Sequence, residues 1–131
     1  MRILVVEDQD AIRVMLEALV SARGHEVVSV NSGVRALDEA ARTPPDLVLL
    51  DLHLPGQYDG LDVCAKLRAN EATRTVPIVM ISAKDDPETR ARAAATGATA
   101  YFGKPFSPLA LLRQVEACDR GRRRGAPESH R

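Results

Sequence analysis

Three carboxylates, a hydroxyl and an ammonium group stand where short apolar runs of this chain end. The run 46–51, Asp-Leu-Val-Leu-Leu-Asp, follows two prolines and ends in Asp51. A run this apolar is typical of a strand buried on both faces of a parallel sheet, and ligands collect beyond the carboxyl ends of such strands. Taken alone, Asp51 could simply open a loop. Complementary groups follow the other apolar runs, namely Glu7, Asp8, Ser82 and Lys104.

The charges of this set indicate a bound cation. Two carboxylates about 4 Å apart repel each other by roughly 4 kcal/mol at an effective dielectric constant near 20, so three together favour proton uptake or a cation. One lysine is too little to neutralise them. A small hard divalent ion fits, and Mg²⁺ keeps coordination positions open for phosphate oxygens. The set therefore predicts a site for Mg²⁺ and a phosphoryl group.

Roles follow from the chemistry of phosphoryl transfer. A carboxylate can attack phosphorus and become an acyl phosphate, which requires in-line positioning and compensation of charge. We expect Asp51 to be the phosphoacceptor. The expected metal ligands are Glu7 through water, Asp8, Asp51 and the backbone carbonyl of His53. The expected phosphoryl-binding groups are Lys104, the Ser82 hydroxyl and the Ala83 backbone N–H.

Five strands alternating with five helices must position these groups. The strands are expected at 2–6, 26–30, 46–51, 77–81 and 99–102, with helices beginning near residues 10, 33, 59, 87 and 108. Short connections predict an α/β fold, a parallel sheet covered on both faces. The expected caps are Asp10, Asn31 or Ser32, and Asp86, and the expected inward-facing residues include Met15, Val34, Ala41 and Leu109.

Length and composition narrow the possible functions. The 131 residues suit one domain, and 3% aromatic residues without Trp argue against stacking on nucleic-acid bases. The apolar run 3–6 is too short for a signal peptide or a membrane span, so we expect a cytoplasmic protein without specific nucleic-acid or membrane partners. Cys64 and Cys118 lack metal-ligand spacing and are expected to be reduced thiols.

The charge is unevenly distributed along the chain. The formal net charge is zero, yet residues 119–131 hold five arginines against Asp119 and Glu128. We expect a folded domain over 1–118 and a basic, disordered C-terminal tail over 119–131. The tail is instead a linker if the natural protein continues, and its arginines supply only a salt-sensitive attraction to nucleic acid.

The chain resembles the receiver domain of bacterial two-component response regulators, in particular the single-domain chemotaxis regulators. The matching stretches are 3–8 with Glu7-Asp8, 51–60 from Asp51 through Leu54-Pro55 to Asp59-Gly60, 79–83 with Ser82, and 101–106 with Lys104-Pro105. The resemblance implies a flavodoxin-like, doubly wound sheet of order 2-1-3-4-5 with five helices. It also implies Mg²⁺-dependent transfer of a phosphoryl group to Asp51 from a sensor histidine kinase or a histidine phosphotransfer protein.

The resemblance further implies a switch. In such domains the hydroxyl at the Ser82 position moves toward the phosphoryl group and the aromatic residue at the Tyr101 position turns inward, which alters the face of the fourth helix, fifth strand and fifth helix. From the sequence alone, Tyr101 could equally be a core residue. A cis peptide bond before Pro105 is also implied, and His53 and Lys84 occupy positions that tune the lifetime of the phosphoryl group.

Two stretches depart from the family pattern. The loop 54–60 has one residue more before Asp59-Gly60 than usual, which could move Tyr58 over the mouth of the site. The run 97–101 lacks the paired acids that support symmetric dimers in one large DNA-binding branch.

The combined interpretation is a single-domain response regulator, a signalling switch that acts through an unidentified downstream protein and is not an enzyme on other substrates. One alternative is a phosphatase or phosphotransferase that uses Asp51 as nucleophile. Such enzymes usually have a second Asp two residues later, where this chain has His53. Another alternative is a receiver-like binding module that is never phosphorylated.

Overall fold

Five apolar runs form the parallel sheet at the centre of the molecule. The computed structural model describes residues 1–125, with the side chains of residues 1–122. The strands are β1 (Arg2–Val6), β2 (Glu26–Val30), β3 (Leu47–Asp51), β4 (Ile78–Ser82) and β5 (Ala100–Gly103). All are parallel, in the order β2-β1-β3-β4-β5 that the resemblance implies. Every residue of β3 and β4 is buried, as expected for strands with helices on both faces.

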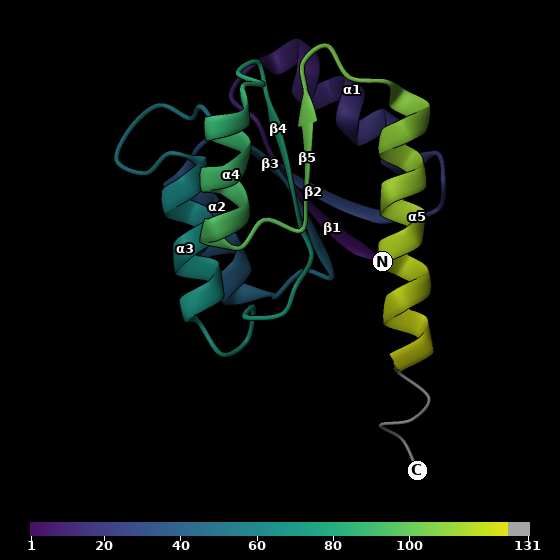
Figure 1. Cartoon of the computed structure of the whole chain (residues 1–131). Helices are drawn as coiled ribbons and strands as arrows, with labels where there is room; N and C mark the ends of the chain where they lie inside the picture. Colours follow the sequence, from purple (N-terminus) through teal and green to yellow (C-terminus); the bar gives the residue numbers. More distant parts are fainter. Residues whose placement is uncertain (126–131) are drawn as a thin grey trace.

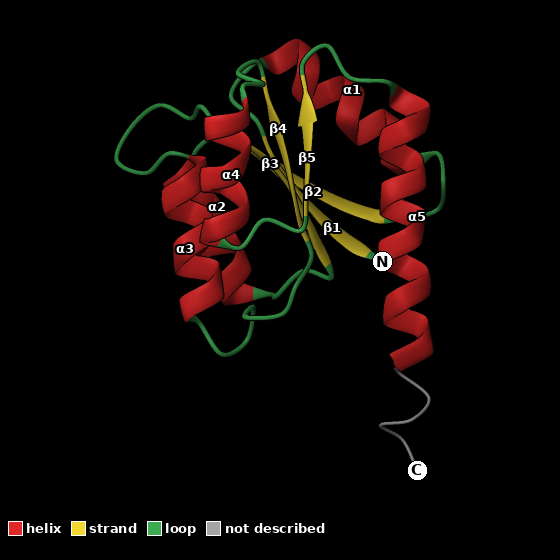
Figure 2. Ribbon diagram, viewed as in Figure 1, coloured by secondary structure: helices red, strands yellow, loops and turns green. Residues whose placement is uncertain are grey.

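The helices cover the two faces of the sheet, α1 and α5 on one and α2, α3 and α4 on the other (Figures 1 and 2). Their bounds are α1 (Asp10–Ser21), α2 (Gly33–Arg42), α3 (Gly60–Ala69), α4 (Pro87–Thr96) and α5 (Pro108–Gly125). Alternate residues of β1 enter different cores: Ile3 and Val5 pack toward α1 and α5, while Leu4 and Val6 pack toward α2 and α3. This alternation is the two-residue period of a strand buried on both sides.

Side-chain caps begin four of the helices, including α5, where the Ser107 hydroxyl accepts a hydrogen bond from the Ala110 N–H at 3.2 Å. The Ser32 hydroxyl accepts a hydrogen bond from the Arg35 N–H, and the Asp86 carboxylate accepts one from the Thr89 N–H, confirming both predictions. Asp59 begins α3 in a reciprocal capping box with Asp62. The prediction for α1 is wrong, because its N-cap is Gln9 and makes no side-chain cap bond.

The predicted inward faces of three helices are partly wrong. Val34 is 40% exposed and Ala41 is exposed, while Gly33, Ala36 and Ala40 are the buried residues of α2. Small side chains let this helix lie close to its neighbours, so the buried stripe is shifted from the larger apolar residues. Met15 on α1 and Leu109 on α5 are also 41% and 53% exposed, because the buried stripes of these helices are formed by Leu16 and Val20 and by Leu111 and Val115.

The last helix is longer than predicted. α5 continues through residue 125, so a disordered tail from residue 119 is wrong for 119–125, and 126–131 lie outside the described residues. Asp119 is buried and pairs with Arg122 one turn later at 3.3 Å, an interaction that supports continued helix. Cys64 and Cys118 are both free thiols. Within the described part of the chain, no helix is both long and apolar enough to cross a lipid bilayer.

Candidate functional site

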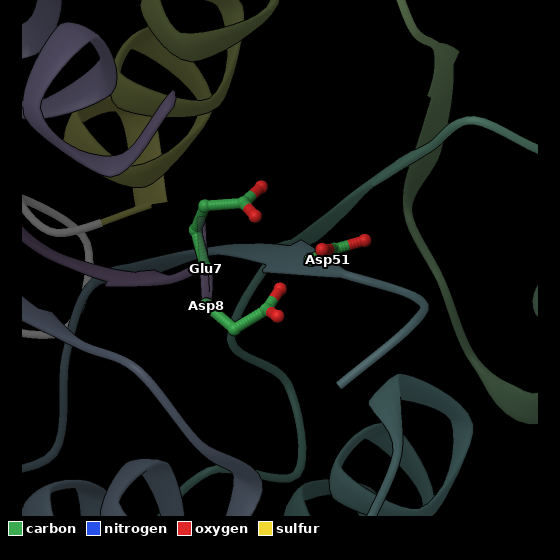
Figure 3. Close-up of side chains that lie close together, drawn as sticks. All are labelled: Glu7, Asp8 and Asp51. Atoms are coloured by element: carbon green, nitrogen blue, oxygen red, sulfur yellow. The ribbon is translucent and has the colours of Figure 1, made fainter. Parts of the chain in front are cut away.

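Three carboxylates meet beyond the ends of β1 and β3. Glu7 and Asp8 follow β1, and Asp51 is the last residue of β3. One oxygen of each lies within 4.8 Å of the others, a spacing that can hold a metal ion. Figure 3 shows the side chains of Glu7 and Asp8 both directed toward Asp51. Glu7 is 1% exposed and Asp51 4%, whereas Asp8 is exposed, so the cluster has a dry side and a side open to solvent.

Lys104 brings one positive charge to the two buried carboxylates. Its Nζ lies 2.9 Å from Glu7 Oε1 and 3.3 Å from Asp51 Oδ2. The Lys104 N–H donates to the Ser82 carbonyl at 2.7 Å, which ties the loop after β5 to the end of β4. The Lys104–Pro105 peptide bond is cis, as the resemblance implies. The predicted acidic set and its lysine are therefore brought together.

Burial, followed by repulsion from Glu7, raises the pKa of Asp51 to about 7. The His53 N–H, which donates to Asp51 Oδ1 at 3.1 Å, and the charge of Lys104 oppose this shift without cancelling it. Burial works against the charge of Lys104, but its hydrogen bond to Glu7 and the charges of Asp51 and Glu7 raise its pKa overall. The electrostatics thus show an excess of negative charge that a divalent cation would relieve. Carboxylate oxygens are ligands that Mg²⁺ prefers.

The start of α3 is packed directly against the end of β3. A Cβ at Gly60 would lie 2.4 Å from the Asp51 carbonyl oxygen and 2.6 Å from the Leu52 Cα, closer than side chains are found. The Gly60 N–H also donates to the Leu52 carbonyl at 2.8 Å. Only glycine permits this approach, so Gly60 holds the backbone that carries Asp51.

The Ser82 hydroxyl is buried at the end of β4, beside the strand that carries Asp51. It accepts a hydrogen bond from the Lys84 N–H at 3.0 Å, so its present partner lies in its own loop. Ala83, expected to supply a backbone N–H, is the residue between the two. His53 and Lys84 line a cavity of about 100 Å³ beside the site, together with Leu52, Asp59, Leu61, Thr89 and Arg92.

The predicted switch residue Tyr101 is half-buried and is held by the loop after β4. Its hydroxyl donates to the Lys84 carbonyl, and the Arg90 guanidinium lies 4.8 Å from the centre of its ring. Arg90 also pairs with Asp85. These contacts link Tyr101 to the start of α4.

Tyr58 does not cover the mouth of the site, contrary to expectation. Its ring lies 4.9 Å from Lys66 Nζ on α3 and packs against the core on that face of the sheet. A Cβ at Gly33, the first residue of α2, would clash with the Tyr58 carbonyl at 2.6 Å. Residues 55–57 are exposed. The extra residue therefore extends the loop outward while Tyr58 remains anchored between α2 and α3.

Two residues at the site were missed in the sequence. The Gln9 N–H donates to Glu7 Oε2 at 3.1 Å, and Arg13 Nη1 donates to the Glu7 carbonyl at 3.0 Å. The first contact is made by the backbone, so residue type gives no signal. The second had a signal, a basic residue one turn into the helix that follows the two acids.

Comparisons with known proteins agree with this geometry. The family model described as the response regulator receiver domain matches residues 3–116. The phosphate regulon transcriptional regulatory protein PhoB of Rhizobium meliloti is 39% identical over 127 residues, which are 97% of this chain and 54% of that protein. The chain therefore spans about half the length of this relative.

Solved structures give the same result. A putative response regulator from Chloroflexus aurantiacus has a TM-score of 0.84 and 34% identity, covering 89% of this chain and 95% of that one. The receiver domain of sensor histidine kinase PA1611 from Pseudomonas aeruginosa, with a magnesium ion coordinated in its active site cleft, has a TM-score of 0.81 and 32% identity, covering 88% and 94%. The chain belongs to the family of response regulator receiver domains.

Proposed function

We propose that Asp51 accepts a phosphoryl group from a phosphohistidine on a sensor histidine kinase or a histidine phosphotransfer protein. The observation that carries this proposal is the cluster of three carboxylates and one lysine that includes Asp51. One oxygen of each carboxylate lies within 4.8 Å of the others, and Lys104 Nζ lies 3.3 Å from Asp51 Oδ2. A purely structural ion-pair cluster would balance its charges. This cluster leaves a negative excess beside a group able to attack phosphorus.

Each residue then has a chemical task. Asp51 supplies the oxygen that forms the new bond to phosphorus, and the donor's N–P bond breaks. Lys104 moves from its carboxylate contacts to a phosphoryl oxygen, and the Ser82 hydroxyl and Ala83 N–H bind another. The metal ligands are Asp8, Asp51 and the His53 carbonyl, with Glu7 acting through water. Bound Mg²⁺ would supply charge compensation for the phosphoryl oxygens.

The proposed output is a change in partner binding at the α4-β5-α5 face. If the Ser82 side chain moves toward the phosphoryl group, as the resemblance implies, its oxygen leaves the Lys84 N–H from which it now accepts a hydrogen bond. The same segment holds the Tyr101 hydroxyl through the Lys84 carbonyl. One rearrangement of this loop therefore acts on both switch residues. Increased hydrogen exchange in 84–103 on phosphorylation would support this coupling, and unchanged exchange there would contradict it.

The phosphoacceptor role is tested with acetyl phosphate and Mg²⁺, read by intact mass. We expect one added phosphoryl group, lost in Asp51→Asn and with a metal chelator. Asp38→Asn, which removes an exposed carboxylate on α2, is the matched control and should be modified like the natural protein.

The same experiment separates the alternative functions. Repeated turnover of unrelated phosphate esters would indicate a phosphatase or phosphotransferase. A protein that gains no mass under any donor and metal condition would be a binding module.

A further inference from the structure

The side chain of Arg13, on α1, contacts the backbone of the acidic loop formed by Glu7 and Asp8. Its Nη1 donates to the Glu7 carbonyl at 3.0 Å and lies 3.5 Å from the Asp8 carbonyl, while its Nη2 pairs with Asp10 at 2.6 Å. The side chain is 19% exposed. One planar guanidinium thus links the first turn of α1 to the backbone of both acids, a geometry that its fork of donors permits.

The acidic loop needs these contacts because Asp8, its exposed acid, has few contacts of its own to fix its carboxylate. The Glu7 side chain is held by Lys104 and by the Gln9 N–H. The Asp8 carboxylate, by contrast, accepts no hydrogen bond from the residues that the structure describes, and α1 begins without a side-chain cap. The position of the Asp8 carboxylate therefore depends on how its backbone is oriented.

We propose that Arg13 is a positioning residue for cation binding: by holding the Glu7 and Asp8 carbonyls, it keeps the Asp8 carboxylate directed toward Asp51. This inference rests on the proposed function, since it assigns Arg13 to the metal site of the same phosphoacceptor. It adds a residue that touches neither the cation nor the phosphoryl group.

Electrostatics and positioning predict opposite effects of removing Arg13. A positive charge beside three carboxylates repels a cation, so its loss by charge alone would tighten Mg²⁺ binding. Because Arg13 contacts carbonyls and its charge is paired with Asp10, the positioning effect should dominate. Loss of a group that orients metal ligands typically weakens metal binding by about tenfold or more.

The test is Mg²⁺ binding measured by isothermal titration calorimetry on the full chain without phosphodonor. Arg13→Met keeps the apolar stem and removes the donors, and we expect Mg²⁺ affinity about tenfold weaker. Arg13→Lys restores the charge but carries its donors on one nitrogen without the planar fork, so its Mg²⁺ affinity should lie between those of Arg13→Met and the natural protein. Arg23→Met is the matched control: it removes the same charge at an arginine whose partner is Glu116, and it should bind Mg²⁺ like the natural protein.

A second readout separates positioning from general stability. The Mg²⁺ concentration for half-maximal phosphorylation should rise in Arg13→Met while the rate at saturating Mg²⁺ is preserved. Unchanged or tighter Mg²⁺ affinity in a folded Arg13→Met would overturn the inference, even if the natural protein is phosphorylated. If calorimetry shows the weaker affinity but no protein gains a phosphoryl group, the positioning role stands and the proposed function fails. If Arg13→Met does not fold, the Mg²⁺ affinity of Arg13→Lys decides the question. An affinity equal to that of the natural protein would overturn the inference.

Discussion

The two rims of the sheet carry similar numbers of charges but arrange them differently. At the amino rim, defined by Arg2, Glu26, Glu39, Arg42 and Asp46, Arg2 bridges Glu26 at 2.8 Å and Glu39 at 3.0 Å, and Arg42 also pairs with Glu39. At the carboxyl rim, defined by Glu7, Asp8, Asp51, Ser82 and Lys104, three carboxylates share one lysine. At the amino rim two arginines contact three carboxylates and join separate elements, whereas the buried carboxylates of the carboxyl rim share one lysine and are suited to binding a further cation.

The largest expected effect is on phosphoryl transfer. Lys104→Met removes the only cation within reach of Asp51 among the described side chains, and we expect the phosphorylation rate to fall by about a hundredfold to a thousandfold. The rate is followed by intact mass at saturating Mg²⁺. Arg2→Met removes one positive charge at the amino rim and should leave the phosphorylation rate unchanged. Equal effects of the two substitutions would erase the distinction between the rims.

The second prediction concerns stability without metal. The pKa of Asp51 is about 7 in the folded protein against 3.8 for the ordinary group. The folded state therefore holds more protons between these values, and the free energy of unfolding falls as pH rises through this window. At about 1.36 kcal/mol per pKa unit, the penalty above pH 7 is at most roughly 4 kcal/mol. Because Asp51→Asn also removes the ion pair with Lys104, we expect it to stabilise the protein by only about 2 kcal/mol at pH 8 and hardly at all near pH 4.

Urea denaturation in the presence of a chelator measures this effect, with Asp46→Asn as the control at the other rim. Asp46 accepts the Arg2 N–H at 2.8 Å, so its neutralisation should destabilise the protein by about 1 kcal/mol. The two Asp-to-Asn substitutions thus have opposite signs. If Asp51→Asn also destabilises at pH 8, the carboxyl rim does not hold an unfavourable charge.

The third prediction is stabilisation by Mg²⁺. At ten times its dissociation constant, Mg²⁺ should raise the free energy of unfolding by about 1.4 kcal/mol. Thermal unfolding at pH 8, with NaCl at matched ionic strength as control, measures the change. Asp51→Asn should lose most of it. A similar gain from NaCl would attribute the effect to screening.

The smallest effect is expected at the amino rim. Arg2→Met should lower the free energy of unfolding by at most about 1 kcal/mol, because its ion pairs are partly solvated, and the loss should shrink at high salt. Urea denaturation at low and high salt measures it. A loss that salt leaves intact would point to packing of the Arg2 stem.

The carboxyl rim could be predicted from the sequence because its signals are local. Asp51 ends a run of buried residues, and parallel connections require such ends to lie on one edge. The strand order and the cis bond before Pro105 came from family resemblance. The raised pKa of Asp51 depends on its burial and on distances to Glu7, which no spacing reveals.

The errors in the prediction also have physical causes. Asp10 is a good capping residue by type, but its carboxylate pairs with Arg13. Apolar periodicity could not choose between adjacent stripes on α2, where alanines make the close contact. The residues after 118 predict disorder because they are rich in arginine and lack apolar periodicity. Arginine is nevertheless a good helix former, and the helix continues through the four arginines at positions 120 and 122–124 to residue 125.

The loop before α3 offers a place to engineer this protein. Leu54 is buried in the core and Tyr58 packs against the start of α2, so both ends of a segment inserted between these two residues would be held in place. Gly56, between them, has a positive φ of 87° and open space around it. A fluorescent peptide grafted there would stand a few residues from the acidic cluster and report on its occupancy without disturbing the scaffold.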